Sequence, residues 1–210
     1  MKLDGLAKQI IQNVDGTTRY IVAIAGPPAS GKTTLAQKLC DNINSKVSAS
    51  LCVVVPMDGF HLDNEKLDQM GIRHIKGAPQ TFDAEGFVEL IQQIRLDSGA
   101  VAIPEFNRKL DAVVLGDQSI NPDHRIIVVE GNYLLLDESP WDQLKSMFDL
   151  SVMLTPEEKT LEKRLISRWE KYAHSEEEAK VRAYSNDIPN AKYASAHSMQ
   201  ADIMVIEIVD

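Results

Sequence analysis

Residues 26–34 read Gly-Pro-Pro-Ala-Ser-Gly-Lys-Thr-Thr, and 26–33 have the residue types and spacing of a phosphate-binding loop, G-x-x-x-x-G-K-[ST]. The glycines let successive backbone N–H groups turn toward one point, and the helix expected next adds its positive N-terminal end. Lys32 is expected to reach the β- and γ-phosphates of a nucleotide, and the Thr33 hydroxyl to hold Mg²⁺. The residues expected to bind the nucleotide are Gly26, Pro27, Pro28, Ala29, Ser30, Gly31, Lys32, Thr33 and Thr34.

Two acidic residues stand at the ends of strand-like apolar runs. Asp58 follows the run 51–56, and Glu130 ends the run 125–130. Ligands of open α/β sheets bind outside the carboxyl ends of the strands, where an unpaired carboxylate is unfavourable. We expect Asp58 to orient an attacking hydroxyl and accept its proton, and Glu130 to coordinate Mg²⁺ directly or through water. The alternative is that each acid caps a local helix or turn.

Arg164 and Arg168 are four residues apart on a predicted helix, so their side chains share one face. Neither has an acidic residue three or four positions away. An anion from outside the helix, such as a γ-phosphate in transfer, would explain this arrangement, and an arginine in that role contributes about 10³–10⁵ in rate. The alternative is a solvated basic face, or contacts with acids elsewhere in the fold.

A phosphate-binding loop alone is compatible with a kinase, a GTPase, a motor ATPase or a regulatory nucleotide binder. Residues 83–86, Asp-Ala-Glu-Gly, match D-x-x-G formally, but they open a predicted helix, and the sequence has no N-K-x-D motif for guanine. Guanine recognition is therefore not expected. A non-catalytic nucleotide-binding regulator is the alternative of another class, and acceptor-dependent ADP production distinguishes it from a kinase.

Alternating strands and helices are expected to position these residues. Continuous apolar runs rich in Val and Ile predict strands covered on both faces, hence a parallel sheet. The predicted strands are 20–25, 51–56, 125–130, 150–155 and 202–209, and the predicted helices are 32–44, 83–97, 140–148, 156–173, 176–185 and 191–199. The repeated strand–helix–strand order predicts an α/β fold with right-handed crossovers. Residues 101–120 fit neither pattern and are expected to form a small hairpin or a functional loop.

One helix start has a specific signal. Thr155 can cap a helix, Pro156 suits its first turn and Glu158 would complete a capping box, so a helix is predicted from 156 onward. This helix leads into the polar, charged stretch 174–193. We expect a lid over about 160–190, whose closure would exclude water and protect ATP from hydrolysis.

Length, charge and cysteine content narrow the class of protein. The 210 residues suit one domain, 1–210. A net charge of −9 argues against a nucleic-acid surface, and no apolar run approaches the roughly 20 residues of a membrane span. Cys40 and Cys52 have no metal-site or disulfide spacing and are expected to be buried. Residues 1–10 lack a signal-peptide core, so a cytoplasmic location is expected.

The order of the motifs resembles that in one superfamily of P-loop kinases. The loop 26–34, Met-Asp-Gly-Phe-His at 57–61, Val-Val-Glu-Gly-Asn-Tyr-Leu-Leu-Leu-Asp at 128–137 and the arginine-bearing helix together resemble uridine kinases, phosphoribulokinases and type I pantothenate kinases. Residues 76–87 are similar to the pantothenate kinase stretch that leads into the helix beside the acceptor site. The chain most resembles the bacterial subgroup called fructose transport system kinases, and the resemblance covers nearly the whole chain.

The resemblance implies a P-loop kinase fold with a five-stranded parallel sheet, helices on both faces and a small helical lid. It implies ATP and Mg²⁺ as cofactors, and it suggests a homodimer. Carried over by position, the functional residues are Lys32 and Thr33 for ATP and Mg²⁺, Asp58 as catalytic base, Glu130 for the metal, Arg164 and Arg168 of the lid, and Asn190 near the adenine.

The acceptor is the part that the resemblance determines least. Asp-Gly-Phe-His at 58–61 departs from the Asp-Ser-Phe-Tyr of uridine kinases, and Asn107 stands where many relatives have aspartate. The residues expected around the acceptor are His61, Arg73, His74, Lys76, Arg108 and Tyr133. Several basic residues together would suit a phosphorylated or carboxylated acceptor, whereas a neutral sugar or nucleoside would need more amide and acid contacts.

The sequence therefore predicts ATP- and Mg²⁺-dependent phosphoryl transfer to a hydroxyl of a small metabolite, with a sugar favoured by the subgroup resemblance. A nucleoside kinase, such as a uridine kinase, and a pantothenate kinase are the alternatives. Phe60, Phe82 and Phe106 lie in the expected acceptor loops, so stacking on a nucleobase stays open.

Overall fold

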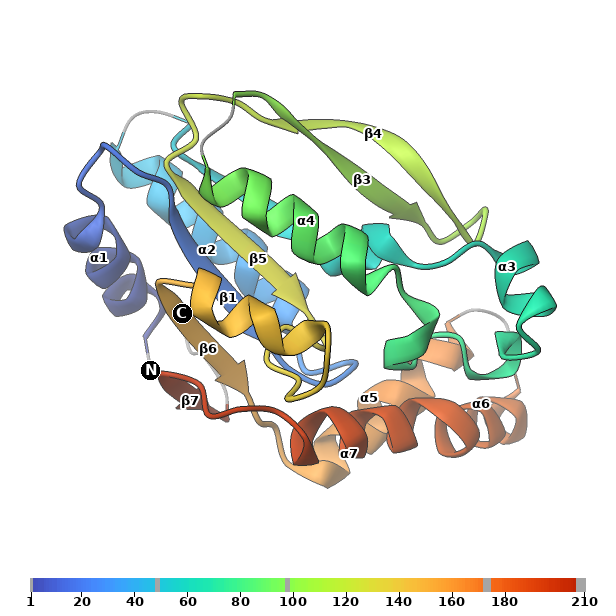
Figure 1. Cartoon of the computed structure of the whole chain (residues 1–210). Coiled ribbons are helices and arrows are strands. Elements are labelled where there is room, and N and C mark those ends of the chain that lie inside the picture. Colours follow the sequence, from blue (N-terminus) through green and yellow to red (C-terminus); the bar gives the residue numbers. More distant parts are fainter. Residues whose placement is uncertain (1, 48–49, 97–98, 172–174, 207–210) are drawn as a thin grey trace.

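A computed structural model describes residues 2–47, 50–96, 99–171 and 175–206 (Figure 1). Its centre is a five-stranded parallel sheet with the order β2-β5-β1-β6-β7. The strands are β1 (Tyr20–Ala25), β2 (Cys52–Pro56), β5 (Ile126–Gly131), β6 (Leu150–Leu154) and β7 (Ile203–Val205). The predicted parallel sheet is confirmed. The last strand is shorter than the predicted 202–209, of which 207–210 lie outside the described residues.

The register of the central strands sets the position of the site. Ile24 of β1 and Pro56 of β2 both pair with Glu130 of β5. The carboxyl ends of three neighbouring strands therefore lie side by side. The loops that follow them carry the phosphate-binding motif, Asp58 and the residues after Glu130 to the same edge.

Helices cover both faces of the sheet because both faces are apolar. On one face α1 (Leu3–Asn13) and α2 (Lys32–Val47) pack through residues such as Leu6, Ile10 and Leu39. On the other face α4 (Ala84–Arg95) and the 3₁₀ segment Trp141–Met147 pack around Phe87 and Trp141. The sequence analysis did not predict α1, and no side-chain cap marks its start at Lys2. Cys40 and Cys52 are buried and free, as expected.

A two-stranded antiparallel hairpin and a group of helices extend beyond the sheet. The hairpin consists of β3 (Val101–Asn107) and β4 (Ala112–Ile120), which confirms one of the two alternatives for residues 101–120. The helices are α5 (Glu158–Glu170), α6 (Glu176–Arg182) and α7 (Ile188–Ala196), with a π-helical turn at Ala183–Asp187. Figure 1 shows the hairpin along one side of the molecule, α5–α7 along the other, and α3 (Asn64–Gln69) between the hairpin tip and α6.

The predicted capping box at Thr155 is wrong. Helix α5 begins at Glu158, and its N-cap residue, Glu157, makes no side-chain cap. The Thr155 backbone N–H and hydroxyl both donate to the Val205 carbonyl, at 2.8 and 3.4 Å. Thr155 therefore continues the pairing between β6 and β7, which withdraws it from the helix end. A capping box does exist one helix later, where Ser175 and Glu178 form it at the start of α6.

The predicted helix 140–148 is a 3₁₀ segment, and the predicted 191–199 begins and ends earlier, as α7. The Asp83 side chain accepts from the Gly86 N–H, so residues 83–86 do open a helix. Among the described residues, no helix has the length and apolar character that crossing a membrane requires.

The hairpin contacts the Asp58 turn through a residue that must be glycine. A Cβ at Gly59 would lie 2.0 Å from the Pro104 carbonyl oxygen of β3. This close approach holds the hairpin over the 3₁₀ turn Met57–Phe60.

We expect Gly59→Ala to lower the free energy of unfolding by about 1–3 kcal/mol, because the added methyl group must displace the hairpin backbone. Denaturant unfolding measures the effect. Gly5→Ala is the matched control, since nothing lies within 4 Å of a Cβ there and alanine is favoured by about 0.5–1 kcal/mol in a helix. Equal or greater stability of Gly59→Ala would contradict the close packing.

Candidate functional site

The phosphate-binding loop joins the end of β1 to the start of α2. Gly31 has φ 96° and Ala29 has φ 61°, both in the left-handed region, and the Ser30 N–H donates to the Pro27 carbonyl at 3.1 Å. A Cβ at Gly26 would lie 2.7 Å from Ser30 Oγ and 3.2 Å from the Leu154 carbonyl oxygen. The loop is therefore wound tightly against β6, and a side chain at Gly26 would have to displace the Ser30 hydroxyl and crowd Leu154.

The loop buries polar groups that the described chain leaves without partners. The Ser30 hydroxyl is inaccessible to solvent and makes no hydrogen bond within the described residues. Lys32 is only 9% exposed, and burial lowers the pKa of its ammonium group, while the charges of Glu130 and Asp58 act in the opposite direction. A buried ammonium with an unpartnered hydroxyl and a helix N-terminus is the donor set that an anion such as a phosphate requires.

Thr33 and Glu130 form an oxygen pair beside Lys32. The Thr33 hydroxyl donates to Glu130 Oε1 at 3.1 Å, and Glu130 is 3% exposed. Burial raises the pKa of this carboxyl group, against the charge of Lys32. Within the described residues, no group of three or more His, Cys, Asp or Glu is arranged to hold a metal. The hydroxyl and carboxylate oxygens of the pair are ligands of the kind that Mg²⁺ takes in small number, with phosphate oxygens and water completing its shell.

Asp58 lies on the turn after β2, with its side chain 30% exposed. Arg108, from the hairpin tip, donates to Asp58 Oδ2 at 2.8 Å. The charge of Asp58 also acts on the pKa values of Lys32 and Glu130. The structure thus brings together the two acids and the lysine that were predicted from separate motifs.

Arg164 and Arg168 lie on the face of α5 that meets the phosphate-binding loop. Arg164 donates from Nη1 to the Ser30 carbonyl at 3.2 Å, and the charge of Arg168 acts on Lys32. With Ser167 and Lys171 they line a hollow of about 480 Å³. No acid is among the described lining residues, so this hollow suits a polyanion. An acid from elsewhere in the fold, Asp187, lies near enough to sense the charge of Arg168: burial raises the pKa of this carboxyl group, and the guanidinium charge opposes that rise.

His61 lies between two phenylalanine rings beside Asp58. Its ring centroid is 4.1 Å from that of Phe82 and 4.5 Å from that of Phe106. Its Nδ1 is 2.8 Å from the Asp58 carbonyl oxygen, which only accepts, so Nδ1 carries the proton. Burial lowers the pKa of His61 and favours the neutral ring, which leaves Nε2 as a hydrogen-bond acceptor.

The two arginines and the lysine predicted around the acceptor each have an acidic partner. Arg73 pairs with Asp68 at 2.8 Å. Lys76 pairs with Asp111 at 2.9 Å and also donates to Asn64 at 2.7 Å. Together with the Arg108–Asp58 pair, these contacts neutralise the cationic cluster that the sequence suggested. His74 is exposed.

Tyr133 is 0% exposed within the core, and its hydroxyl donates to the Gly77 carbonyl, in the stretch 76–87, at 2.6 Å. Its place around the acceptor stays a prediction. Its position after the end of β5 suggested that Tyr133 would be accessible to a ligand, but the residues after this strand turn into the core. Asn190 is also buried and donates to Asn186 at 3.1 Å, and a Cβ at Gly77 would lie 3.9 Å from its Nδ2. Its place near the adenine stays a prediction.

The sequence analysis missed several polar residues of this region. Asn132 Oδ1 follows β5, is buried and has no hydrogen-bond partner within the described residues. The amide of Asn186 and the carboxylate of Asp187 lie in the turn between α6 and α7 and contact Lys76 and Trp169. No local pattern marks the two turn residues, because their partners are distant in the chain.

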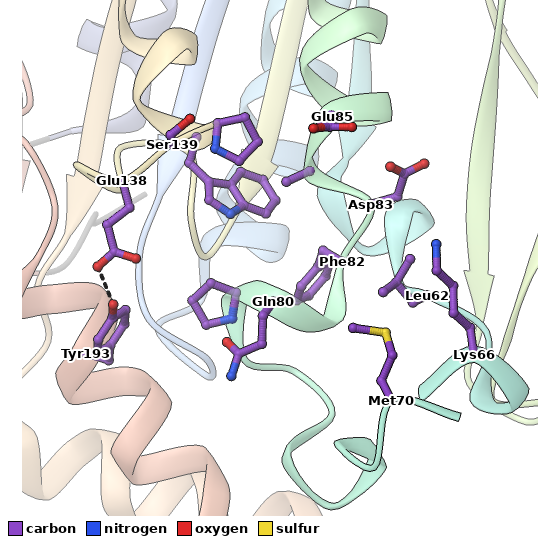
Figure 2. Close-up of a pocket in the computed structure, with 14 residues that line it drawn as sticks. Leu62, Lys66, Met70, Gln80, Phe82, Asp83, Glu85, Glu138, Ser139 and Tyr193 are labelled. Atoms are coloured by element: carbon purple, nitrogen blue, oxygen red, sulfur yellow. Dashed lines mark hydrogen bonds between the residues drawn. The ribbon is translucent and has the colours of Figure 1, made fainter. Parts of the chain in front are cut away.

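A second hollow, of about 420 Å³, lies next to residues 76–87, called the acceptor segment below, and its described lining includes none of the phosphate-binding residues. Figure 2 shows it between the start of α4, the Glu138–Ser139 loop and Tyr193 of α7, whose hydroxyl donates to Glu138. Phe82 lines this hollow and also packs on His61. The lining residues are Leu62, Lys66, Met70, Pro79, Gln80, Phe82, Asp83, Ala84, Glu85, Glu138, Ser139, Pro140, Trp141 and Tyr193.

Comparison with known proteins identifies similar chains. Residues 21–208 match the phosphoribulokinase/uridine kinase family. A protein of Schizosaccharomyces pombe, provisionally named a uridine kinase, is 29% identical over 98% of this chain and 90% of its own length. A pantothenate kinase of Mycolicibacterium vanbaalenii is 28% identical over 75% of this chain. The matched region spans 50% of the length of that relative.

A solved structure is similar over nearly the whole chain. It comes from Silicibacter sp. TM1040 and is provisionally named a fructose transport system kinase. It is 36% identical, covers 98% of this chain and 99% of its own, and superposes with a TM-score of 0.91.

We expect Lys32→Ala to weaken nucleotide binding by about 10- to 100-fold, because a charge-assisted hydrogen bond contributes about 1.5–3 kcal/mol. Calorimetric titration of ATP in the presence of Mg²⁺ measures the dissociation constant. Lys163→Ala, an exposed lysine of α5, is the control. An unchanged dissociation constant for Lys32→Ala would remove this lysine from the phosphate site.

Proposed function

Because the chain belongs to the phosphoribulokinase/uridine kinase family of small-molecule kinases, we propose that it transfers the γ-phosphate of ATP to a hydroxyl of a neutral sugar, in the presence of Mg²⁺. The observation that carries this proposal is the convergence of Lys32, Glu130 and Asp58 at one edge of the sheet. A buried phosphate-binding lysine and a partly exposed carboxylate in one charge cluster can align a phosphoryl group with an alcohol.

The nucleotide is proposed to bind along the loop 26–34. Its backbone N–H groups and Lys32 hold the phosphates, and the Ser30 hydroxyl gains the partner that it lacks within the described chain. Thr33 and Glu130 would hold Mg²⁺, which when bound neutralises charge between the phosphates. The glutamate–threonine contact already places both oxygens beside Lys32.

Asp58 is proposed to orient the attacking hydroxyl and accept its proton. A carboxylate is a weak base for an alcohol, but in a loose phosphoryl-transfer transition state orientation is the main contribution. The side chain is partly exposed, and Arg108 holds one of its oxygens. The acceptor hydroxyl can therefore approach the carboxylate from the open side.

Arg164 and Arg168 are proposed to neutralise charge on the transferring phosphoryl group. Their hollow is cationic and adjoins the Ser30 carbonyl of the loop. Helices α5–α7 would act as the lid predicted over about 160–190, which excludes water from the transfer.

The sugar proposal rests on the charges and rings of the acceptor side. Arg73, Lys76 and Arg108 are each already paired with an acid, so a carboxylated or phosphorylated acceptor would have to break an ion pair to bind one of them. His61 is favoured in its neutral form. These features favour an uncharged, hydroxyl-rich acceptor over pantothenate.

The rings that could stack on a nucleobase are already in contact with protein groups. Phe60 packs on Phe87, with ring centroids 5.1 Å apart. Phe82 and Phe106 enclose His61, and Lys76 lies 5.0 Å from the Phe106 centroid. This arrangement favours a sugar over uridine, in keeping with the name of the Silicibacter relative. A uridine kinase is the second candidate, because the Schizosaccharomyces pombe relative carries that name. A cytoplasmic location and a homodimer stay predictions.

An ADP-release screen tests the acceptor class. We expect turnover with fructose or another neutral sugar, and little with pantothenate, uridine, cytidine or sugar phosphates. The Lys32→Ala protein supplies the background rate. Turnover that depends on an anionic acceptor would show that the ion pairs open on binding and would reject the neutral-acceptor proposal. Turnover with uridine alone would establish the second candidate.

We expect Asp58→Asn to lower kcat by about 10²–10⁴, the range of a lost general base, while the dissociation constant for ATP changes less than about twofold. Steady-state kinetics and calorimetry measure the two quantities. Asp63→Asn, an exposed acid of the same loop region whose side chain makes no helix cap, is the control. A normal kcat for Asp58→Asn would exclude Asp58 as the base.

A further inference from the structure

The π-helical turn Ala183–Asp187 contacts two parts of the proposed site that are far apart in the sequence. The Asn186 amide donates to the Lys76 carbonyl at 2.8 Å. The next residue, Asp187, accepts a hydrogen bond from the Trp169 indole of α5. Single π-helical turns within helices occur frequently at functional sites. Consecutive residues of one turn therefore connect the acceptor segment to the arginine-bearing helix.

Asp187 is a buried acid within a group of aromatic and cationic side chains. It is 9% exposed. The guanidinium carbon of Arg182 lies 4.7 Å from the Trp169 ring centroid, and that of Arg168 lies 5.9 Å away. Burial raises the pKa of Asp187, and the Trp169 hydrogen bond and the charges of both arginines oppose that rise. The carboxylate and Arg168, the arginine proposed to meet the γ-phosphate, thus both lie against the Trp169 side chain.

Several hydrogen bonds from different elements hold the acceptor segment at Lys76 and Gly77, where Asn186 contacts it. Its two consecutive carbonyls have different donors, since Lys76 receives the Asn186 amide and Gly77 receives the Tyr133 hydroxyl. Gly77 has φ 103°, a conformation that side chains rarely adopt. The Lys76 ammonium is bound to Asp111 at the hairpin tip. Movement of this segment would therefore reach both the hairpin and the π-helical turn.

We propose that Asp187 is a positioning residue that orients Arg168 toward the nucleotide phosphates, and that Asn186 links this orientation to the acceptor segment at Lys76. The inference rests on the proposed function for its kinetic part. A purely structural role would not need a charged group, because a buried ion cluster is often replaced by apolar residues without loss of stability. The retained carboxylate instead places a negative charge at the edge of the Trp169 ring, which attracts the Arg168 guanidinium to this ring in the absence of phosphate.

Asp187→Asn separates the charge from the hydrogen bond, because the amide oxygen can still accept from the Trp169 indole. We expect kcat to fall about 10- to 100-fold through misplacement of Arg168, with the ATP dissociation constant and the melting temperature nearly unchanged. Glu177→Gln removes an exposed acid of α6 and is the matched control. Asn186→Ala is expected to raise KM for the acceptor about tenfold while nucleotide affinity is retained.

A fluorescence measurement tests the arrangement without any acceptor. The sequence has two tryptophans, so Trp141→Phe leaves Trp169 as the only one. We expect a non-hydrolysable ATP analogue with Mg²⁺ to change Trp169 emission, because Arg168 leaves the ring when the γ-phosphate arrives. The change should be lost when Asp187→Asn is added.

No nucleotide-dependent change in the Trp141→Phe protein, or the same change with Asp187→Asn, would overturn the proposal. A normal kcat with a lowered melting temperature would do so too, since it indicates a structural role. If no acceptor is phosphorylated but the Asp187-dependent emission change is present, the positioning role stands and the proposed function is the part that fails.

Discussion

The arrangement of the site depends on two opposite charges, those of Lys32 and Glu130, which are buried at the carboxyl edge of the sheet. Lys32 begins α2 and Glu130 lies near the end of β5. Burial lowers the pKa of Lys32 and raises that of Glu130, and their mutual attraction opposes both shifts. Such a pair gains little stability by itself, because desolvation offsets the attraction. The Ser30 hydroxyl beside them has no partner within the described chain. The edge therefore has the composition of a site completed by phosphates and a cation.

Three segments approach this edge, and polar contacts hold each of them to the next. The hairpin reaches Asp58 through Arg108, and it reaches the acceptor segment through Asp111 and Lys76. The acceptor segment reaches the turn before α7 through Asn186. Such contacts at the surface open more easily than the apolar layers that cover the sheet. A fixed phosphate site is thus surrounded by segments that can adjust to an acceptor.

The predicted acceptor side loses its excess positive charge in the folded chain, because its arginines and lysine form ion pairs. In the sequence, Arg73, Lys76 and Arg108 form a cationic group that would suit an anion. In the fold, each meets an acid. The helix of Arg164 and Arg168 keeps its cationic face toward the phosphate-binding loop. Positive charge available for an anion is therefore concentrated on the nucleotide side, which distinguishes the two halves of the site.

The sequence by itself determined the phosphate-binding loop, four of the five strands nearly to their ends, and the placement of Asp58 and Glu130 at one edge of the sheet. Apolar runs define strands locally, and parallel strands bring their carboxyl ends to one edge. The burial of Tyr133, the pairing of Arg108 with Asp58, and the hydrogen bonds of Thr155 to Val205 of β7 were decided only by the tertiary structure. Each of these depends on a contact between segments far apart in the chain, and no local pattern of residues encodes which distant group will fill a given space.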